Sequence, residues 1–263
     1  MSESVPAKLY KYQAFSERML TTLKCRTIWF GQPSRLNDPF DCEVPYQIAP
    51  ITLENCQQLL AQRDDPDWQR FKKDRTLVDA NGMPTEKFRM ALDEAARNSL
   101  VTVATDSYSG RGVTCFSESP LNTLLWSHYG GGHRGVCLEF DTTDLVFHRF
   151  LKVSYSDAAP TINLVDVLLG DSSQVFWGML TKAACWSYER EWRAIHKQAD
   201  TEYCYGTTAL SGIYFGARLL PAEIDLIAHL LHGSPTKLYQ VRRQEGSFNL
   251  EAAEAFYTPH SYT

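Results

Sequence analysis

Short strand-like segments and helical patterns follow one another in mixed order along this chain, and no other feature constrains its fold as strongly. Strands are predicted at 9–12, 27–30, 113–117, 135–140, 150–155, 192–196, 213–215 and 237–242. Helices are predicted after an N-cap at Ser16 and at 53–62, 67–78, 85–104, 120–129, 162–169, 173–184 and 221–231. Because the connections are short and the order is mixed, we expect an α+β fold with a mostly antiparallel central sheet and flanking helices.

Residues 53–104 have a composition of their own. The stretch 61–99 holds eight basic and eight acidic residues, a balance typical of solvated helices. No internal repeat or low-complexity linker divides the 263 residues. We therefore expect a single domain, residues 1–263, with a helical insertion at about 53–104.

The overall charge limits the classes of partner. The chain has 26 basic and 31 acidic residues, a formal net charge of −5, which argues against a broad nucleic-acid-binding surface.

The chain's first residues lack a signal-peptide core, and no run of about 18 apolar residues occurs. The seven cysteines are scattered, mostly within apolar runs, a pattern typical of reduced, buried thiols. We therefore expect a cytoplasmic protein without a membrane segment.

The first of three polar, aromatic segments combines residues 10–12 with the loop 34–41. Asp38, Asp41 and Glu43 could hold a hard cation through their oxygen atoms. A turn in which Asx side chains bond their own backbone before a proline explains the same residues more simply. The turn is the favoured interpretation, so no metal is implied.

The second segment begins with Ser119 as a predicted N-cap and Pro120 at the first position of a short helix. His128 follows an apolar row on this helix, so a core histidine and a functional histidine are both open. The glycines at 130–132 then end the helix and would let backbone approach a ligand. His128 and His133 are five residues apart across this turn and do not share a helix face, so they are a weak candidate for a pair of metal ligands.

The third segment covers residues 186–193. If it is extended, Glu189, Glu191 and Arg193 point to one side of the strand, and the aromatic residues point to the other. Two carboxylates on one strand face lie roughly 7 Å apart and could share a substrate. The alternative is a solvated strand face on which one glutamate pairs with an arginine.

Three motifs follow one another in these segments. They are Pro-Ser-Arg-x-Asn-Asp-Pro-Phe-Asp at 33–41, a Cys-Phe-Ser-Glu to Leu-Glu-Phe block at 115–140, and Tyr-Glu-x-Glu-Trp-Arg at 188–193. Together they resemble the bacterial family known as domain of unknown function 2971. The resemblance runs from about residue 8 to 216. It leaves the activity open, because the family itself has no settled function.

The order of the same segments is also similar to the three-part active site of ADP-ribosyltransferases, which use NAD. This resemblance implies that Tyr10 or Tyr12 holds the ribose, that Ser117 and Tyr129 grip the nicotinamide, and that Glu191 bonds the ribose. A carboxylate there would stabilise the positive charge that builds on the sugar when the nicotinamide bond breaks. The chain lacks the first-strand histidine or arginine that is usual in those enzymes.

The leading hypothesis is therefore an NAD-using enzyme of the ADP-ribosyltransferase type, acting as a toxin or a phage-defence effector. The expected catalytic residues are Glu191, His128 and Tyr129. The expected ligand-binding residues are Tyr10, Tyr12, Arg35, Ser117, Trp126, His133 and Arg193.

Two alternatives stay open. One is a hydrolase of nucleic acid or nucleotides that uses His128, His133 and Glu191 as acid, base or metal ligands. The other is a non-catalytic domain that binds a small molecule or a protein in an aromatic groove lined by Trp126, Tyr129, Trp186 and Trp192. Convergence of Tyr12, His128 and Glu191 in one pocket would favour an enzyme. The sequence does not indicate an oligomeric state.

Overall fold

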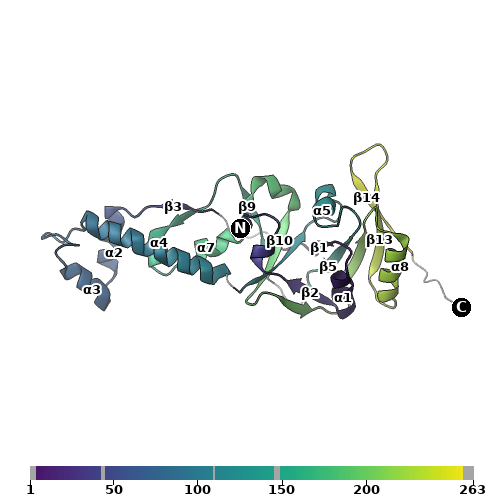
Figure 1. Cartoon of the computed structure of the whole chain (residues 1–263), viewed down its shortest axis with the longest axis horizontal. Coiled ribbons are helices and arrows are strands. Elements are labelled where there is room, and N and C mark those ends of the chain that lie inside the picture. The colour runs from purple at the N-terminus through teal and green to yellow at the C-terminus, as the bar shows by residue number, and fades with distance from the viewer. Residues whose placement is uncertain (1–3, 43–44, 109, 145–148, 257–263) are drawn as a thin grey trace. The chain divides into compact units, whose positions relative to one another are not determined.

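The computed structural model describes residues 4–42, 45–108, 110–144 and 149–256. These residues form two compact units (Figure 1). The sheet unit takes the described parts of 1–36, 110–155 and 182–263, and the helical unit takes those of 37–109 and 156–181. The predicted insertion at 53–104 thus lies in the helical unit, and the single-domain assignment stays a prediction.

The sheet unit is built on one eight-stranded sheet, in the order β14-β13-β12-β5-β1-β4-β10-β6. Neighbouring strands run antiparallel except β12 and β13, which are parallel. The prediction of an α+β fold with a mostly antiparallel sheet is confirmed. The strands are β1 (Lys8–Gln13), β4 (Gly112–Ser117), β5 (Val136–Asp141), β6 (Leu151–Lys152), β10 (Glu191–His196), β12 (Leu210–Phe215), β13 (Lys237–Arg243) and β14 (Leu250–Glu254).

Shorter elements complete this unit. Strands β2 (Thr27–Phe30) and β11 (Thr201–Cys204) form a separate antiparallel pair. The helices are α1 (Glu17–Cys25), α5 (Thr123–His128) and α8 (Pro221–Leu230), with 3₁₀ helices η1 (Pro33–Arg35) and η2 (Ala184–Glu189). Strands β7 (Ser154–Ser156) and β9 (Thr181–Ala183) lie where the chain passes from one unit to the other.

The helical unit has its own apolar core. Its elements are β3 (Gln47–Ala49), α2 (Leu53–Gln62), α3 (Pro66–Lys73), α4 (Glu86–Tyr108), β8 (Thr161–Asn163), α6 (Leu164–Leu168) and α7 (Ser173–Gly178). Trp68 of α3 and Phe88 of α4 are buried in the core and meet edge to face. Strands β3 and β8 pair in parallel.

Local signals explain several boundaries. Ser16 caps α1 by accepting a hydrogen bond from the Met19 N–H, and Pro221 opens α8. The predicted helix at 120–129 is shorter, because Asn122, not Ser119, provides the N-cap of α5. The helices predicted at 67–78 and 173–184 end earlier, at Lys73 and Gly178. The start of the helix predicted at 162–169 is instead part of strand β8, and the strand predicted at 150–155 is split into β6 and β7.

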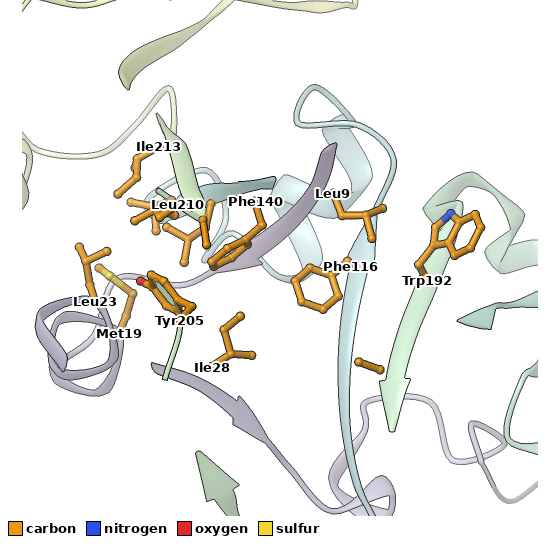
Figure 2. Packing of buried hydrophobic residues seen from close by; sticks show 14 of the residues in the cluster. Leu9, Met19, Leu23, Ile28, Phe116, Phe140, Trp192, Tyr205, Leu210 and Ile213 are labelled. Carbon is orange, nitrogen blue, oxygen red and sulfur yellow. The ribbon is translucent and has the colours of Figure 1, made fainter. Parts of the chain in front are cut away.

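One face of the sheet carries the larger apolar core of this unit. Figure 2 shows Leu9 of β1, Phe116 of β4 and Phe140 of β5 among its buried side chains. Met19 and Leu23 of α1 pack into the same cluster. Since side chains alternate along a strand, the residues between these core positions point to the opposite face, where the polar residues gather.

Candidate functional site

A polar row crosses three neighbouring strands on the face opposite the larger core. In the strand register Tyr10 of β1 lies opposite Ser117 of β4, and Ser117 lies opposite Glu191 of β10. Directly opposed residues share a face of the sheet, so these three side chains lie side by side. The row continues on the other side of Tyr10 to Glu139 of β5. The sheet order therefore brings together residues that are far apart in the sequence.

Glu191 is an ion-paired, buried carboxylate with only 4% of the residue exposed. It accepts hydrogen bonds from the Arg193 guanidinium at 2.8 and 3.0 Å, and the Lys182 ammonium lies 3.6 Å away. Burial acts to raise the pKa of Glu191, but the attraction of Arg193 and Lys182 outweighs it, so the pKa lies below its ordinary value. Glu191 is thus held ionised.

Glu189 is the second buried carboxylate. It accepts hydrogen bonds from the Lys182 ammonium at 2.7 Å and from the Tyr129 hydroxyl at 2.8 Å. Burial is the main cause that raises the pKa of Glu189 above its ordinary value, and Lys182 offsets part of it. Lys182 therefore bridges Glu189 and Glu191, which are named the carboxylate pair below. Tyr129, one of the expected catalytic residues, thus contacts the carboxylate pair through Glu189.

The segment before Glu191 is not extended, so the predicted strand alternation across 186–193 is wrong. Residues 184–189 form η2, and Arg190 adopts the left-handed conformation with φ 44° before β10 begins. Two side chains from the motif block at 115–140 hold this turn in place. The Ser117 hydroxyl donates to the Glu189 carbonyl at 2.7 Å, and the Asn122 amide donates to the Tyr188 carbonyl at 2.8 Å. Ser117 thus positions Glu189 through the backbone.

An aromatic group lies beside the carboxylate pair. The His128 ring packs against Trp186 at 5.8 Å, Tyr188 at 6.4 Å and Tyr129 at 6.1 Å between centroids. The Lys182 ammonium lies 4.8 Å from the centre of the Trp186 ring. His128 is exposed, so the core-histidine interpretation is wrong. These rings form a stacking surface next to the buried charges.

Tyr12, Trp126 and His133 belong to a separate group that supports the fold. The Tyr12 hydroxyl donates to the Ser119 carbonyl at 2.7 Å, and its ring packs edge to face on Trp126. Trp126 is fully buried, and His133 stacks on it at 6.2 Å. Burial and the charge of Arg218 lower the pKa of His133. Tyr12, His128 and Glu191 therefore sit in different groups of contacts.

Arg35 lies outside these groups. It is exposed and pairs with Asp200 at 3.1 Å. In the following loop the Asp38 carboxylate accepts a hydrogen bond from the Phe40 N–H at 3.0 Å, which confirms the Asx turn. Glu43 lies outside the described residues, and within those residues no group of three or more histidine, cysteine or acidic side chains is placed to bind a metal ion.

Sequence reasoning missed Glu139, the last member of the polar row. Its carboxylate accepts hydrogen bonds from Lys8 at 3.0 Å, Ser211 at 2.7 Å and Tyr214 at 2.9 Å. Burial and this carboxylate raise the pKa of Tyr10 to about 12. A lone glutamate between Leu138 and Phe140 in an apolar strand was the available signal. Beside Glu139 a hollow of about 470 Å³ is lined by Lys8, Thr208, Leu210, Ser211, Pro235, Lys237 and Tyr239.

The Glu139 network predicts an acid-dependent loss of stability. Burial acts to raise the pKa of Glu139, but the hydrogen bonds from Ser211, Lys8 and Tyr214 lower it below its ordinary value of 4.5. The ionised Glu139 carboxylate therefore stabilises the fold fully at pH values above its pKa in the unfolded chain. This stabilisation is lost as the pH falls through the lower pKa of Glu139 in the folded protein. We expect Glu139→Gln to reduce the free energy of unfolding by roughly 1–3 kcal/mol at neutral pH. In urea titrations this difference should shrink as the pH falls below about 4. Glu251→Gln, on an exposed strand position, is the control, and its free energy of unfolding should equal that of the wild type at every pH. If the difference between Glu139→Gln and the wild type did not change with pH, the stabilising role of the ionised Glu139 carboxylate would be contradicted.

None of the seven cysteines, all of which lie within the described residues, forms a disulfide. Cys42, Cys56 and Cys137 are buried as expected, but Cys25, Cys185 and Cys204 are exposed. The prediction of mostly buried thiols is wrong for these three because they lie at a helix end, in η2 and on a peripheral strand. Among the helices within the described ranges, none is both long and apolar enough to cross a membrane.

Comparison with known proteins agrees with the motifs. The family model for proteins of unknown function DUF2971 matches residues 125–194, so the chain resembles that family in this segment. The match runs from α5 into β10 and contains Tyr129, Lys182 and both members of the carboxylate pair. No curated protein matches the chain, and no solved structure matches it.

Proposed function

We propose that the carboxylate pair and the aromatic group form the active site of an NAD-using enzyme, a transferase or glycohydrolase of the ADP-ribosyltransferase type. The observation that supports this most strongly is the row of Tyr10, Ser117 and Glu191 across three adjacent strands. These are the positions that the resemblance assigns to ribose, nicotinamide and catalytic carboxylate. Consumption of NAD would suit a toxin or a phage-defence effector.

The charges around Glu191 suit the chemistry. When the nicotinamide–ribose bond breaks, positive charge develops on the sugar, and a fixed carboxylate stabilises it. Arg193 keeps Glu191 ionised and restricts its orientation through two hydrogen bonds. Lys182 shares its charge between both glutamates, which keeps two buried carboxylates compatible with folding.

Tyr129 and the aromatic group would receive the substrate. Tyr129 is half-buried, and its hydroxyl occupies one hydrogen-bonding position on Glu189. While it donates to Glu189, this hydroxyl can still accept a hydrogen bond from a ribose hydroxyl on binding. The exposed His128 ring, with Trp186 and Tyr188 beside it, offers flat surfaces on which a planar ring can stack.

The test is to incubate the pure protein with NAD and to measure nicotinamide release by chromatography. We expect release by the wild type and a roughly tenfold lower rate for Tyr129→Phe, the effect of losing one hydrogen bond to a charged group of about 1.4 kcal/mol. Tyr239→Phe is the matched control, since Tyr239 is half-buried in the same unit and remote from the carboxylate pair in the sheet order. Its rate should equal that of the wild type.

A binding domain is the second candidate, because the carboxylates of the pair already have cationic partners while the aromatic rings beside them are accessible. RNA and DNA cleavage are measured alongside nicotinamide release to separate the candidates. Cleavage of nucleic acid without nicotinamide release would favour the hydrolase. Absence of both activities would favour the binding domain, and either result would contradict the NAD-using enzyme.

A further inference from the structure

Strand β14 forms one edge of the central sheet (Figure 1). It pairs with β13 and, as far as the described residues go, with no other strand. Phe248 before this strand and Phe256 after it are almost completely exposed, at 103% and 93%. A free strand edge offers unpaired N–H and C=O groups to another strand, and exposed aromatic side chains beside it favour an interaction surface.

The pairing with β13 determines which backbone groups of β14 face outward. The Ala255 N–H donates to the Leu238 carbonyl, and the Gln244 N–H donates to the Asn249 carbonyl. Bonded positions alternate in an antiparallel ladder, so the odd-numbered residues of β14 bond inward. The N–H and C=O groups of Leu250, Ala252 and Glu254 therefore point to the outer edge.

One register lets a second copy of β14 use all of these groups. When two antiparallel copies are centred on Ala252, Ala252 faces itself and Leu250 faces Glu254 of the second copy. All three outward residues then occupy hydrogen-bonded positions, with about six backbone bonds across the pair. Glu251 faces Ala253, so no like charges are directly opposed, whereas centring on Glu251 or Glu254 would oppose two carboxylates.

The same register accounts for the two exposed aromatic residues. Phe248 lies four residues before Ala252 and Phe256 lies four residues after it. If the pairing continues beyond the strand ends, Phe248 of each copy approaches Phe256 of the other, and both rings lose contact with water. The small side chain of Ala252 at the symmetry axis lets the two strands meet closely.

We propose that the β14 edge is the interface of a homodimer in which two copies pair antiparallel about Ala252 and form one continuous sheet. The dimer is symmetric, and each β14 supplies the same residues to it. This inference rests on the edge of the sheet and is independent of the proposed function.

Sedimentation equilibrium over a concentration series tests the dimer. Ala252→Pro removes an outward N–H and leaves the bonds to β13, a substitution that edge strands tolerate. We expect the dissociation constant to rise about tenfold or more, equivalent to about 1.4 kcal/mol, and Phe256→Ser to weaken the dimer as well. Phe40→Ser is the matched control, since Phe40 is 60% exposed in the other unit. A monomer at every concentration, or a dimer that Ala252→Pro leaves unchanged, overturns the proposal.

Cross-linking tests the register. The background carries Cys25→Ser, Cys185→Ser and Cys204→Ser, because these native cysteines are exposed. Hydrogen-bonded antiparallel residues have Cα atoms about 5.5 Å apart, a separation that a disulfide can span. Ala252→Cys should therefore give an oxidised dimer joined at the introduced cysteines, identified by mass spectrometry, while Glu251→Cys should give little. The reverse result, or equal cross-linking by both variants, overturns the register.

Discussion

Replacement of Arg193 by alanine should lower the free energy of unfolding by about 3–5 kcal/mol, the effect of removing one partner from a buried ion pair. Arg193 is completely buried and donates two hydrogen bonds to Glu191. Its loss leaves a buried carboxylate that faces Lys182, and Lys182 is already bonded to Glu189. It also removes a large side chain from a packed site. Urea denaturation followed by circular dichroism measures the change.

Arg35→Ala provides the matched control for this variant. Arg35 also pairs with an acidic residue, Asp200, but 64% of its side chain is exposed. Exposed ion pairs contribute about 0–1 kcal/mol, so this variant should be close to the wild type. Equal losses in the two variants would contradict the view that burial makes the Arg193–Glu191 pair important.

Replacement of Glu191 by glutamine should reduce the rate of nicotinamide release about a hundred- to thousandfold, or 2.7–4 kcal/mol of transition-state stabilisation. Glutamine keeps the shape of the side chain and removes the charge that would face the developing sugar cation. The structure also predicts lower stability, because Arg193 and Lys182 lose a buried counter-charge. The rate is therefore measured well below the melting temperature and divided by the folded fraction.

Glu202→Gln serves as the control, since Glu202 is an exposed glutamate on β11 of the same unit. It should retain full activity and stability. If activity in Glu191→Gln fell only as much as the folded fraction did, Glu191 would be a structural partner of Arg193 and not a catalytic carboxylate. Wild-type activity with an unchanged fold would rule out both roles.

Much of the fold was predictable because its signals are local. Ser16 as a cap, Pro221 at the start of α8 and the apolar segments of β1 and β4 each act within a few residues. Strands β11 and β14 were missed. Neither strand has a fully buried residue, because both lie at the periphery of the fold. Their conformation depends on their partner strands.

The sequence predicted which residues belong to the candidate site better than it predicted how they are arranged. The sequence motifs indicated Ser117, Tyr129 and Glu191, and the order of the strands then determined which of them are neighbours. That order depends on pairing between segments remote in the chain, which periodicity does not encode. Lys182 was missed because it is a single lysine without a motif. The left-handed Arg190, which separates the two glutamates, was missed because this conformation is rare for arginine.

Two contacts around Glu191 come from the residues at which the chain leaves and rejoins the sheet unit. Tyr155 is the last residue before the excursion at 156–181, and Lys182 is the first residue after it. The Tyr155 hydroxyl accepts a hydrogen bond from the Glu191 N–H, and Lys182 binds both glutamates. Both ends of this excursion are therefore anchored at the carboxylate pair. Any change of sequence within 156–181 that leaves the glutamates in place must therefore keep these two anchors.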